Sequence, residues 1–213
     1  MSYNCIIFDC DGVLVDSESI CNQVIVDLAN QSGANINLEY AMKTFVGTSL
    51  DFVIKNIESI IGKKLPSNFS SEYRRISFIR FQQEIQPVKG ITEVLEQLEV
   101  PFCVASNGPL NKMALNLELT GLSKYFQGKM FSAYEINAWK PDPALFLTAA
   151  KTMGFEPKDC AVVEDSLSGI KAGIAGGFDV FAFDHSNKMD ASNQDGITVF
   201  TEMSGLLELL KKA

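Results

Sequence analysis

The sequence predicts an α/β protein whose core is a doubly wound parallel sheet, with an all-helical domain inserted after the first strand. Short runs rich in β-branched and aromatic residues alternate along the chain with amphipathic helical segments. This alternation is typical of a parallel sheet with helices on both faces. The first and fourth runs are almost continuously apolar, as expected for strands that are covered on both faces. One long stretch between the first two runs has helical periodicity and no convincing strand.

The sheet domain is expected to be Rossmann-like and to comprise residues 1–16 and 87–213. We expect its strands over residues 5–8, 102–105, 129–132, 161–163, 180–183 and 198–200. We expect its helices near residues 91–98, 111–119, 143–153, 167–175 and 203–212.

The helical insertion is expected to span residues 17–86. Apolar residues recur at every fourth position in two parts of it, namely Ile20, Val24 and Leu28, and then Val53, Ile57 and Ile61. Such spacing places the apolar side chains on one face of a helix. Three glycines and Pro66 divide the stretch, which therefore predicts three or four helices.

The composition indicates a globular, acidic protein. Of 213 residues, 46% are hydrophobic and the formal net charge is −8, which disfavours nucleic acid and anionic membrane surfaces as partners. No apolar run approaches the roughly 20 residues of a membrane span. The first residues lack the features of a secretory signal, and the five cysteines show no metal-binding spacing. We therefore expect a reduced, soluble, cytoplasmic protein.

Acidic residues follow two of the apolar strands. Asp9 and Asp11 follow the first strand, and Glu164 and Asp165 follow the strand at 161–163. Each pair alone could be a turn or a helix cap. However, ligands of a doubly wound sheet bind beyond the carboxyl ends of the strands, and four carboxylates there need a cation. Oxygen ligands favour a hard dication, so we infer magnesium.

Two further segments lie where an anion could bind. The strand at 102–105 runs into Ser106-Asn107-Gly108, whose hydroxyl and backbone N–H groups precede a helix. Lys140 lies between Trp139 and two nearby prolines that stiffen its loop. Alone, these would be a helix cap and a surface lysine. With the acids they form a phosphoryl-transfer site that has a nucleophile, an acid/base, a metal and oxygen-binding groups. No phosphate-binding or dinucleotide glycine motif is present.

These four segments resemble, in order, the four motifs of the haloacid dehalogenase superfamily, in its phosphatase and β-phosphoglucomutase-like branch. The first motif is similar to residues 9–18, the second to Ser106-Asn107-Gly108, the third to Lys140-Pro141, and the fourth to Glu164-Asp165-Ser166 with Gly169 and Ala172. The resemblance covers essentially the whole chain. Residues 106–113 and 139–145 also resemble the family's phosphatases of 6-phosphogluconate.

The resemblance implies a role for each matching residue. Asp9 would attack phosphorus to form an aspartyl phosphate, and Asp11 would act as acid and then base. Ser106 and Lys140 would hold the phosphoryl oxygens, with help from Asn107. Magnesium would be bound by Asp9, the backbone carbonyl of Asp11, and Asp165, with Glu164 as a direct ligand or one step removed.

In the family, the helical block is a cap domain that closes over the site and selects the substrate. Phe45-Val46-Gly47-Thr48-Ser49 resembles the cap loop that reaches the substrate, so Gly47 and Thr48 are expected to bind it. Arg74 is a further candidate, although an arginine on a helix is commonly a solvated surface charge.

The resemblance therefore implies a magnesium-dependent phosphatase of a small sugar-phosphate or sugar-acid-phosphate monoester, of the 6-phosphogluconate type. It would be a monomer or a small homo-oligomer. The alternative is a phosphomutase of the β-phosphoglucomutase type. That branch carries an arginine just past the cap-loop glycine and a histidine early in the cap. Here Leu50 lies near the first position and residues 17–86 contain no histidine, which favours the phosphatase.

Overall fold

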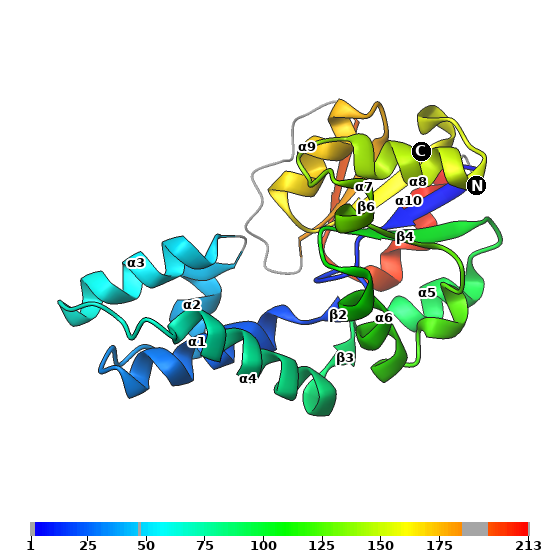
Figure 1. Cartoon of the computed structure of the whole chain (residues 1–213). Coiled ribbons are helices and arrows are strands. Elements are labelled where there is room, and N and C mark those ends of the chain that lie inside the picture. Colours follow the sequence, from blue (N-terminus) through cyan, green and yellow to red (C-terminus); the bar gives the residue numbers. More distant parts are fainter. Residues whose placement is uncertain (1–2, 47, 185–195, 213) are drawn as a thin grey trace. The chain divides into compact units, whose positions relative to one another are not determined.

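The computed structural model describes residues 3–46, 48–184 and 196–212. The chain divides into two compact units (Figure 1). The sheet unit comprises Met1–Val15 and Gln86–Ala213, and the helical unit comprises Asp16–Ile85. The first strand, in blue, and the last helix, in red, lie in the same unit (Figure 1). The sheet unit is therefore built from both ends of the sequence.

The sheet unit contains a six-stranded parallel sheet in the order β5-β4-β1-β6-β7-β8. Its strands are β1 (Cys5–Phe8), β4 (Phe102–Ser106), β5 (Met130–Ser132), β6 (Cys160–Glu164), β7 (Asp179–Phe183) and β8 (Ile197–Phe200). Each of the six predicted runs forms one of these strands. The predicted doubly wound parallel sheet is confirmed.

Strand β1 is apolar along its whole length, as suits a strand at the centre of this sheet. All four of its residues are completely buried, and β4 and β6 pair with it on either side. The chain runs outward from β1 through β4 to β5, then returns to β6 and runs outward to β8. The order of strands therefore reverses beside β1, at the position where doubly wound sheets bind their ligands.

Helices cover both faces of the sheet. Figure 1 shows α8 and α9 on one side of the strands and α5 and α6 on the other. Leu145 and Phe146 of α8 and Ile170 of α9 pack in one cluster with Ile7 of β1 and Val162 of β6. The α-helices of this unit are α5 (Ile91–Gln97), α6 (Leu110–Leu119), α7 (Ala133–Ile136), α8 (Ala144–Met153), α9 (Leu167–Ala175) and α10 (Leu206–Lys212), with short 3-10 helices at Ser123–Tyr125, Pro157–Asp159 and Met203–Gly205.

The structure differs from the sequence-based expectation in three places. Helix α7 was not expected, because one helical turn is too short to produce a periodic pattern. The helix expected over 203–212 begins as the 3-10 turn that ends at Gly205. Two short strands, β2 (Val15–Asp16) and β3 (Gln86–Pro87), pair where the chain passes from one unit to the other.

The helical unit consists of α1 (Glu18–Gln31), α2 (Leu38–Phe45), α3 (Leu50–Ile61) and α4 (Phe69–Glu84). Four of the six apolar residues predicted to share a face of α1 or of α3 lie in the buried core of this unit, and Ile61 packs against it. Val24 and Ile57 are completely buried. Among the described residues, no helix has both the length and the apolar character needed to cross a membrane.

Two asparagines at helix starts in this unit provide a test of its local stability. The Asn37 side chain accepts a hydrogen bond from the Tyr40 N–H at the start of α2, whereas Asn68 starts α4 without a side-chain cap bond. Asn37→Ala should lower the free energy of unfolding by about 1 kcal/mol, because it leaves a helix N–H without its partner.

The matched control is Asn68→Ala, which should change the stability by much less. Urea unfolding of the two variants checks this. Equal losses in both would contradict the capping role of Asn37.

Candidate active site

Three polar residues meet at the carboxyl ends of three adjacent strands. Asp9 directly follows β1, Ser106 ends β4, and Glu164 ends β6. The Asp9 N–H donates to the Val163 carbonyl at 2.9 Å, so the parallel pairing of β1 and β6 continues to the acid itself. Asp9 and Ser106 are nearly buried, and Glu164 is completely buried. The sheet thereby fixes these groups where the sequence predicts them.

The Lys140 ammonium lies between two of the carboxylates. Its Nζ is 2.5 Å from Asp9 Oδ1 and 2.7 Å from Glu164 Oε2. The Phe146 ring packs on it, with the ring centroid 4.7 Å from Nζ, a distance at which an aromatic face attracts a cation. The lysine side chain is only 3% exposed. This burial excludes the bland interpretation of Lys140 as a solvated surface lysine.

The Asn107 side chain holds the loop that carries Lys140. Its Oδ1 accepts from the Lys140 N–H at 2.8 Å, and its Nδ2 donates to the Lys140 carbonyl at 3.4 Å. The two bonds join residues that are 33 positions apart in the sequence. Asn107 was predicted as a substrate-binding residue, and the structure gives its side chain a second task, the placement of Lys140.

Glu164 is fixed by hydrogen bonds on both of its oxygens. Oε2 accepts from Lys140, while Oε1 accepts from the N–H groups of Asp165 and Ser166 and from the Ser166 hydroxyl, at 2.8–3.2 Å. The carboxylate fills the space above Gly169, where a Cβ atom would lie 2.0 Å from Oε2. Glycine is therefore required there, and Glu164 has a single orientation.

Burial controls the protonation of this group of charges. Burial is the largest cause that raises the pKa of Asp9, the Glu164 charge adds to it, and Lys140 opposes both, so that the pKa lies at about 7. Burial alone would lower the pKa of Lys140, but the Asp9 and Glu164 carboxylates raise it above its ordinary value. A single ammonium thus serves two carboxylates and does not fully stabilise both.

Asp9, Glu164 and Asp165 form a cluster that could hold a metal ion, with one oxygen of each within 4.8 Å of the others. Asp165 approaches Gly12 so closely that a Cβ there would lie 1.9 Å from its Oδ2. If Asp9 and Glu164 are both ionised, the Lys140 ammonium that contacts them offsets only one of their two charges. Three oxygen donors and the remaining charge fit a hard dication.

The Asp11 carboxylate points to a different partner. Lys112 Nζ lies 2.9 and 3.1 Å from its two oxygens. Sequence reasoning gave Lys112 no role, because a lysine in the first turn of a helix resembles any surface lysine. Asp11 contributes no side-chain oxygen to the three-residue cluster, and a metal bond from its backbone carbonyl stays a prediction.

The candidate residues of the insertion lie in the helical unit. Gly47 lies outside the described residues. Thr48 is exposed, and its hydroxyl donates to the Phe45 carbonyl at 2.7 Å. Arg74 is exposed on α4. Its neighbours Arg75 and Arg80 are paired with acids, but Arg74 forms no ion pair with the residues that the structure describes. A substrate role for these residues stays a prediction.

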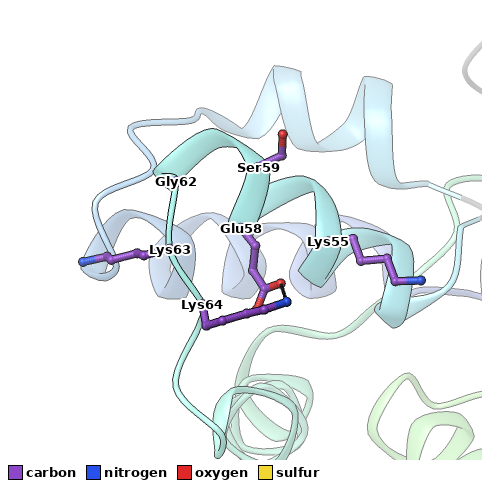
Figure 2. Close-up of a pocket in the computed structure, with 6 residues that line it drawn as sticks. All are labelled: Lys55, Glu58, Ser59, Gly62, Lys63 and Lys64. Carbon is purple, nitrogen blue, oxygen red and sulfur yellow. Dashed lines mark hydrogen bonds and ion pairs between the residues drawn. The ribbon is translucent and has the colours of Figure 1, made fainter.

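A separate pocket lies on the helical unit at the end of α3. Its volume is about 450 Å³, and Figure 2 shows the Lys64 side chain against Glu58, with Lys63 extending in another direction. None of the predicted site residues lines it. The lining residues are Lys55, Glu58, Ser59, Gly62, Lys63 and Lys64.

Known proteins resemble this chain in both sequence and fold. Residues 3–177 match the family model of the haloacid dehalogenase-like hydrolases. The 6-phosphogluconate phosphatase of Escherichia coli is 37% identical over 209 residues, which cover 97% of this chain and 94% of that protein. The chain belongs to the haloacid dehalogenase-like hydrolases. Its sequence similarity to a phosphatase over nearly the whole chain identifies it as a phosphoric monoester hydrolase.

Solved structures of haloacid dehalogenase-like proteins agree with this assignment. One from Agrobacterium tumefaciens, of unknown function, has a TM-score of 0.88 and 30% identity, covering 99% of this chain and 98% of its own. A hydrolase of this family from Deinococcus radiodurans, with bound phosphate and sodium, has a TM-score of 0.84 and 26% identity. It covers 99% of this chain and 96% of its own.

The raised pKa of Asp9 predicts how the stability of this hydrolase depends on pH in the presence of a chelator. The pKa rises from 3.8 to about 7 on folding. The contribution of Asp9 to stability is therefore complete below about pH 4 and is lost as the pH rises through about 7. Asp9→Asn removes this dependence.

We therefore compare the free energies of unfolding of Asp9→Asn and of the wild type, measured in urea. Between about pH 5 and pH 8, the stability of the variant should rise relative to that of the wild type by about 1–3 kcal/mol. A constant difference between the two proteins would contradict the pKa assigned to Asp9.

Proposed function

We propose that this protein is a magnesium-dependent phosphatase that hydrolyses a small sugar-phosphate or sugar-acid-phosphate monoester through an aspartyl phosphate on Asp9. The observation that carries the proposal is the grouping of three carboxylates, Asp9, Glu164 and Asp165, which offer one oxygen each within 4.8 Å of one another, beside the buried ammonium that pairs with the first two. Such a site suits a dication and the phosphoryl group that binds to it.

In the proposed reaction, Asp9 Oδ attacks phosphorus while the bond from phosphorus to the ester oxygen breaks. Asp11 donates its proton to the leaving oxygen, which departs as an alcohol. A water molecule then attacks the phosphoenzyme, Asp11 takes its proton, and the bond from Asp9 to phosphorus breaks to release phosphate. Asp9 and Asp11 are the two protein side chains that form or break covalent bonds in these steps.

Lys140 and Ser106 bind the phosphoryl oxygens in this scheme. Both are nearly buried, Ser106 at the end of β4 and Lys140 in the loop before α8, so their positions are set before the substrate arrives. Asp9, the backbone carbonyl of Asp11, and Asp165 would hold magnesium, which supplies charge neutralisation to the phosphoryl group when bound. Glu164 supports both groups, because it fixes Lys140 and adjoins Asp165.

The helical unit is proposed as the cap that selects the substrate, with Gly47, Thr48 and Arg74 as its contacts. Arg74 is favoured over Arg75 and Arg80, because both of these are already paired with acids. An arginine there suits a second anionic group, such as the carboxylate of a sugar acid. Similarity to the 6-phosphogluconate phosphatase of E. coli over 97% of the chain supports this substrate class.

We place the enzyme in the cytoplasm, as a monomer or a small homo-oligomer, in keeping with its bacterial relative. A phosphomutase activity is less well supported, because Leu50 stands where mutases of the family carry an arginine and residues 17–86 lack a histidine.

The proposal predicts phosphate release from a panel of sugar phosphates and sugar-acid phosphates with magnesium present, measured as inorganic phosphate. The highest kcat/KM is expected with 6-phosphogluconate or a similar acid. Asp9→Asn should lower kcat by about 10⁴-fold or more, because the amide is not a nucleophile.

Asp159→Asn is the matched control. Asp159 directly precedes the amino end of β6, whereas Glu164 lies at the carboxyl end of the same strand. It should retain the wild-type rate. No phosphate release from any ester by the wild type with magnesium, or full activity in Asp9→Asn, would contradict the proposal.

A further inference from the structure

The contact between Asp11 and Lys112 points to a residue of the reaction that the family motifs do not include. Lys112 lies in the first turn of α6 and Asp11 lies just beyond β1, 101 positions apart in the sequence. The ammonium is almost equally distant from the two carboxylate oxygens, at 2.9 and 3.1 Å. Contact with both oxygens fixes where the carboxylate lies and how its plane is turned.

The surroundings of Lys112 place it in the wall of the phosphoryl site. A Cβ atom built on Gly108 would lie 3.3 Å from Ser106 Oγ, 3.8 Å from Lys112 Cδ and 3.9 Å from Asp11 Oδ2. These three side chains therefore surround one glycine. The Ser132 hydroxyl donates to the Gly108 carbonyl at 2.8 Å and ties this loop to the end of β5. The lysine stem thus lies near the same glycine as the Ser106 hydroxyl and the Asp11 carboxylate.

The two lysines of the site serve different carboxylates. Lys140 is buried against Asp9, on the side of the nucleophile. Lys112 pairs with Asp11, on the side of the leaving group, and the side chains of this pair are 33% and 29% exposed. Ion pairs with that much exposure add little to stability. A contribution to folding therefore does not account for the lysine, whereas the placement of a reacting group does.

We propose that Lys112 is a positioning residue that holds the Asp11 carboxyl group at the leaving oxygen of the substrate. The inference rests on the proposed function, in which the proton of Asp11 passes to the ester oxygen as the bond to phosphorus breaks. A group misplaced by a fraction of an ångström transfers that proton poorly. The need is greatest for alkyl phosphates such as sugar phosphates, whose leaving alkoxide must be protonated.

The need to protonate the leaving oxygen distinguishes a positioning role from a structural one, because only a positioning role makes the effect of a substitution depend on the leaving group. Nitrophenolate leaves without a proton, so the hydrolysis of p-nitrophenyl phosphate does not need Asp11 in its first step. Lys112→Met keeps the apolar stem of the side chain and removes the charge. It should lower kcat/KM, which reports only the steps up to release of the leaving group, about 10–100-fold for 6-phosphogluconate, a part of the effect of general acid catalysis. The same parameter for p-nitrophenyl phosphate should fall less than about 3-fold.

Lys112→Arg restores a cation and should recover most of the activity towards 6-phosphogluconate. Lys171→Met is the matched control, because Lys171 is an exposed lysine on α9. It should leave both rates unchanged. These rates are measured with magnesium present on protein whose circular dichroism spectrum matches that of the wild type.

The outcomes separate this inference from the proposed function. Equal losses on the two esters in Lys112→Met, or full activity of that variant on both, would overturn the positioning role while the phosphatase activity stands. A wild-type enzyme that releases phosphate from neither ester would overturn both. A selective loss on 6-phosphogluconate that Lys112→Arg reverses is the result that we expect.

Discussion

The contact of one buried ammonium with two buried carboxylates is the constraint on which the rest of the site depends. Lys140 reaches Asp9 and Glu164 at once, which requires β1 and β6 to be neighbours in register. It also requires the loop before α8 to return over their carboxyl ends. Asn107 holds that loop through two hydrogen bonds, and Phe146 covers the ammonium. Buried ion pairs of this kind are costly to form and are retained where they position chemistry.

The same contact leaves the site with more negative charge than one lysine offsets. The raised pKa of Asp9 has burial as its main cause, and the charge of Glu164 adds to it. A nucleophile must be ionised to attack phosphorus, so the site needs another positive charge near Asp9. A dication at the cluster of Asp9, Glu164 and Asp165 supplies that charge and binds the substrate in the same place. The burial that raises the pKa of Asp9 is thus also the reason that the reaction needs a metal ion.

Much of this arrangement was predictable from the sequence. Apolar strands end in acids, and parallel strands bring their carboxyl ends to one edge, so the meeting of Asp9 with Glu164 follows from local patterns. The contacts of Asn107 with Lys140 and of Lys112 with Asp11 were not predictable. Each joins residues far apart in the chain, and neither an asparagine in a turn nor a lysine on a helix has a distinguishing pattern. Helix α7 and the pairing of β2 with β3 were missed because they are too short to show periodicity.

Magnesium titration by calorimetry measures directly whether the carboxylate cluster binds a dication, because its three oxygen donors should create one binding site in each chain. Asp165→Asn should abolish that binding, since it removes one carboxylate donor of the cluster, while the exposed acid Glu93 can be changed to glutamine without effect. We expect one magnesium bound by the wild type and by Glu93→Gln, and none bound by Asp165→Asn at the same concentrations. Equal affinity in all three proteins, or no binding by the wild type, would contradict a metal site at this cluster.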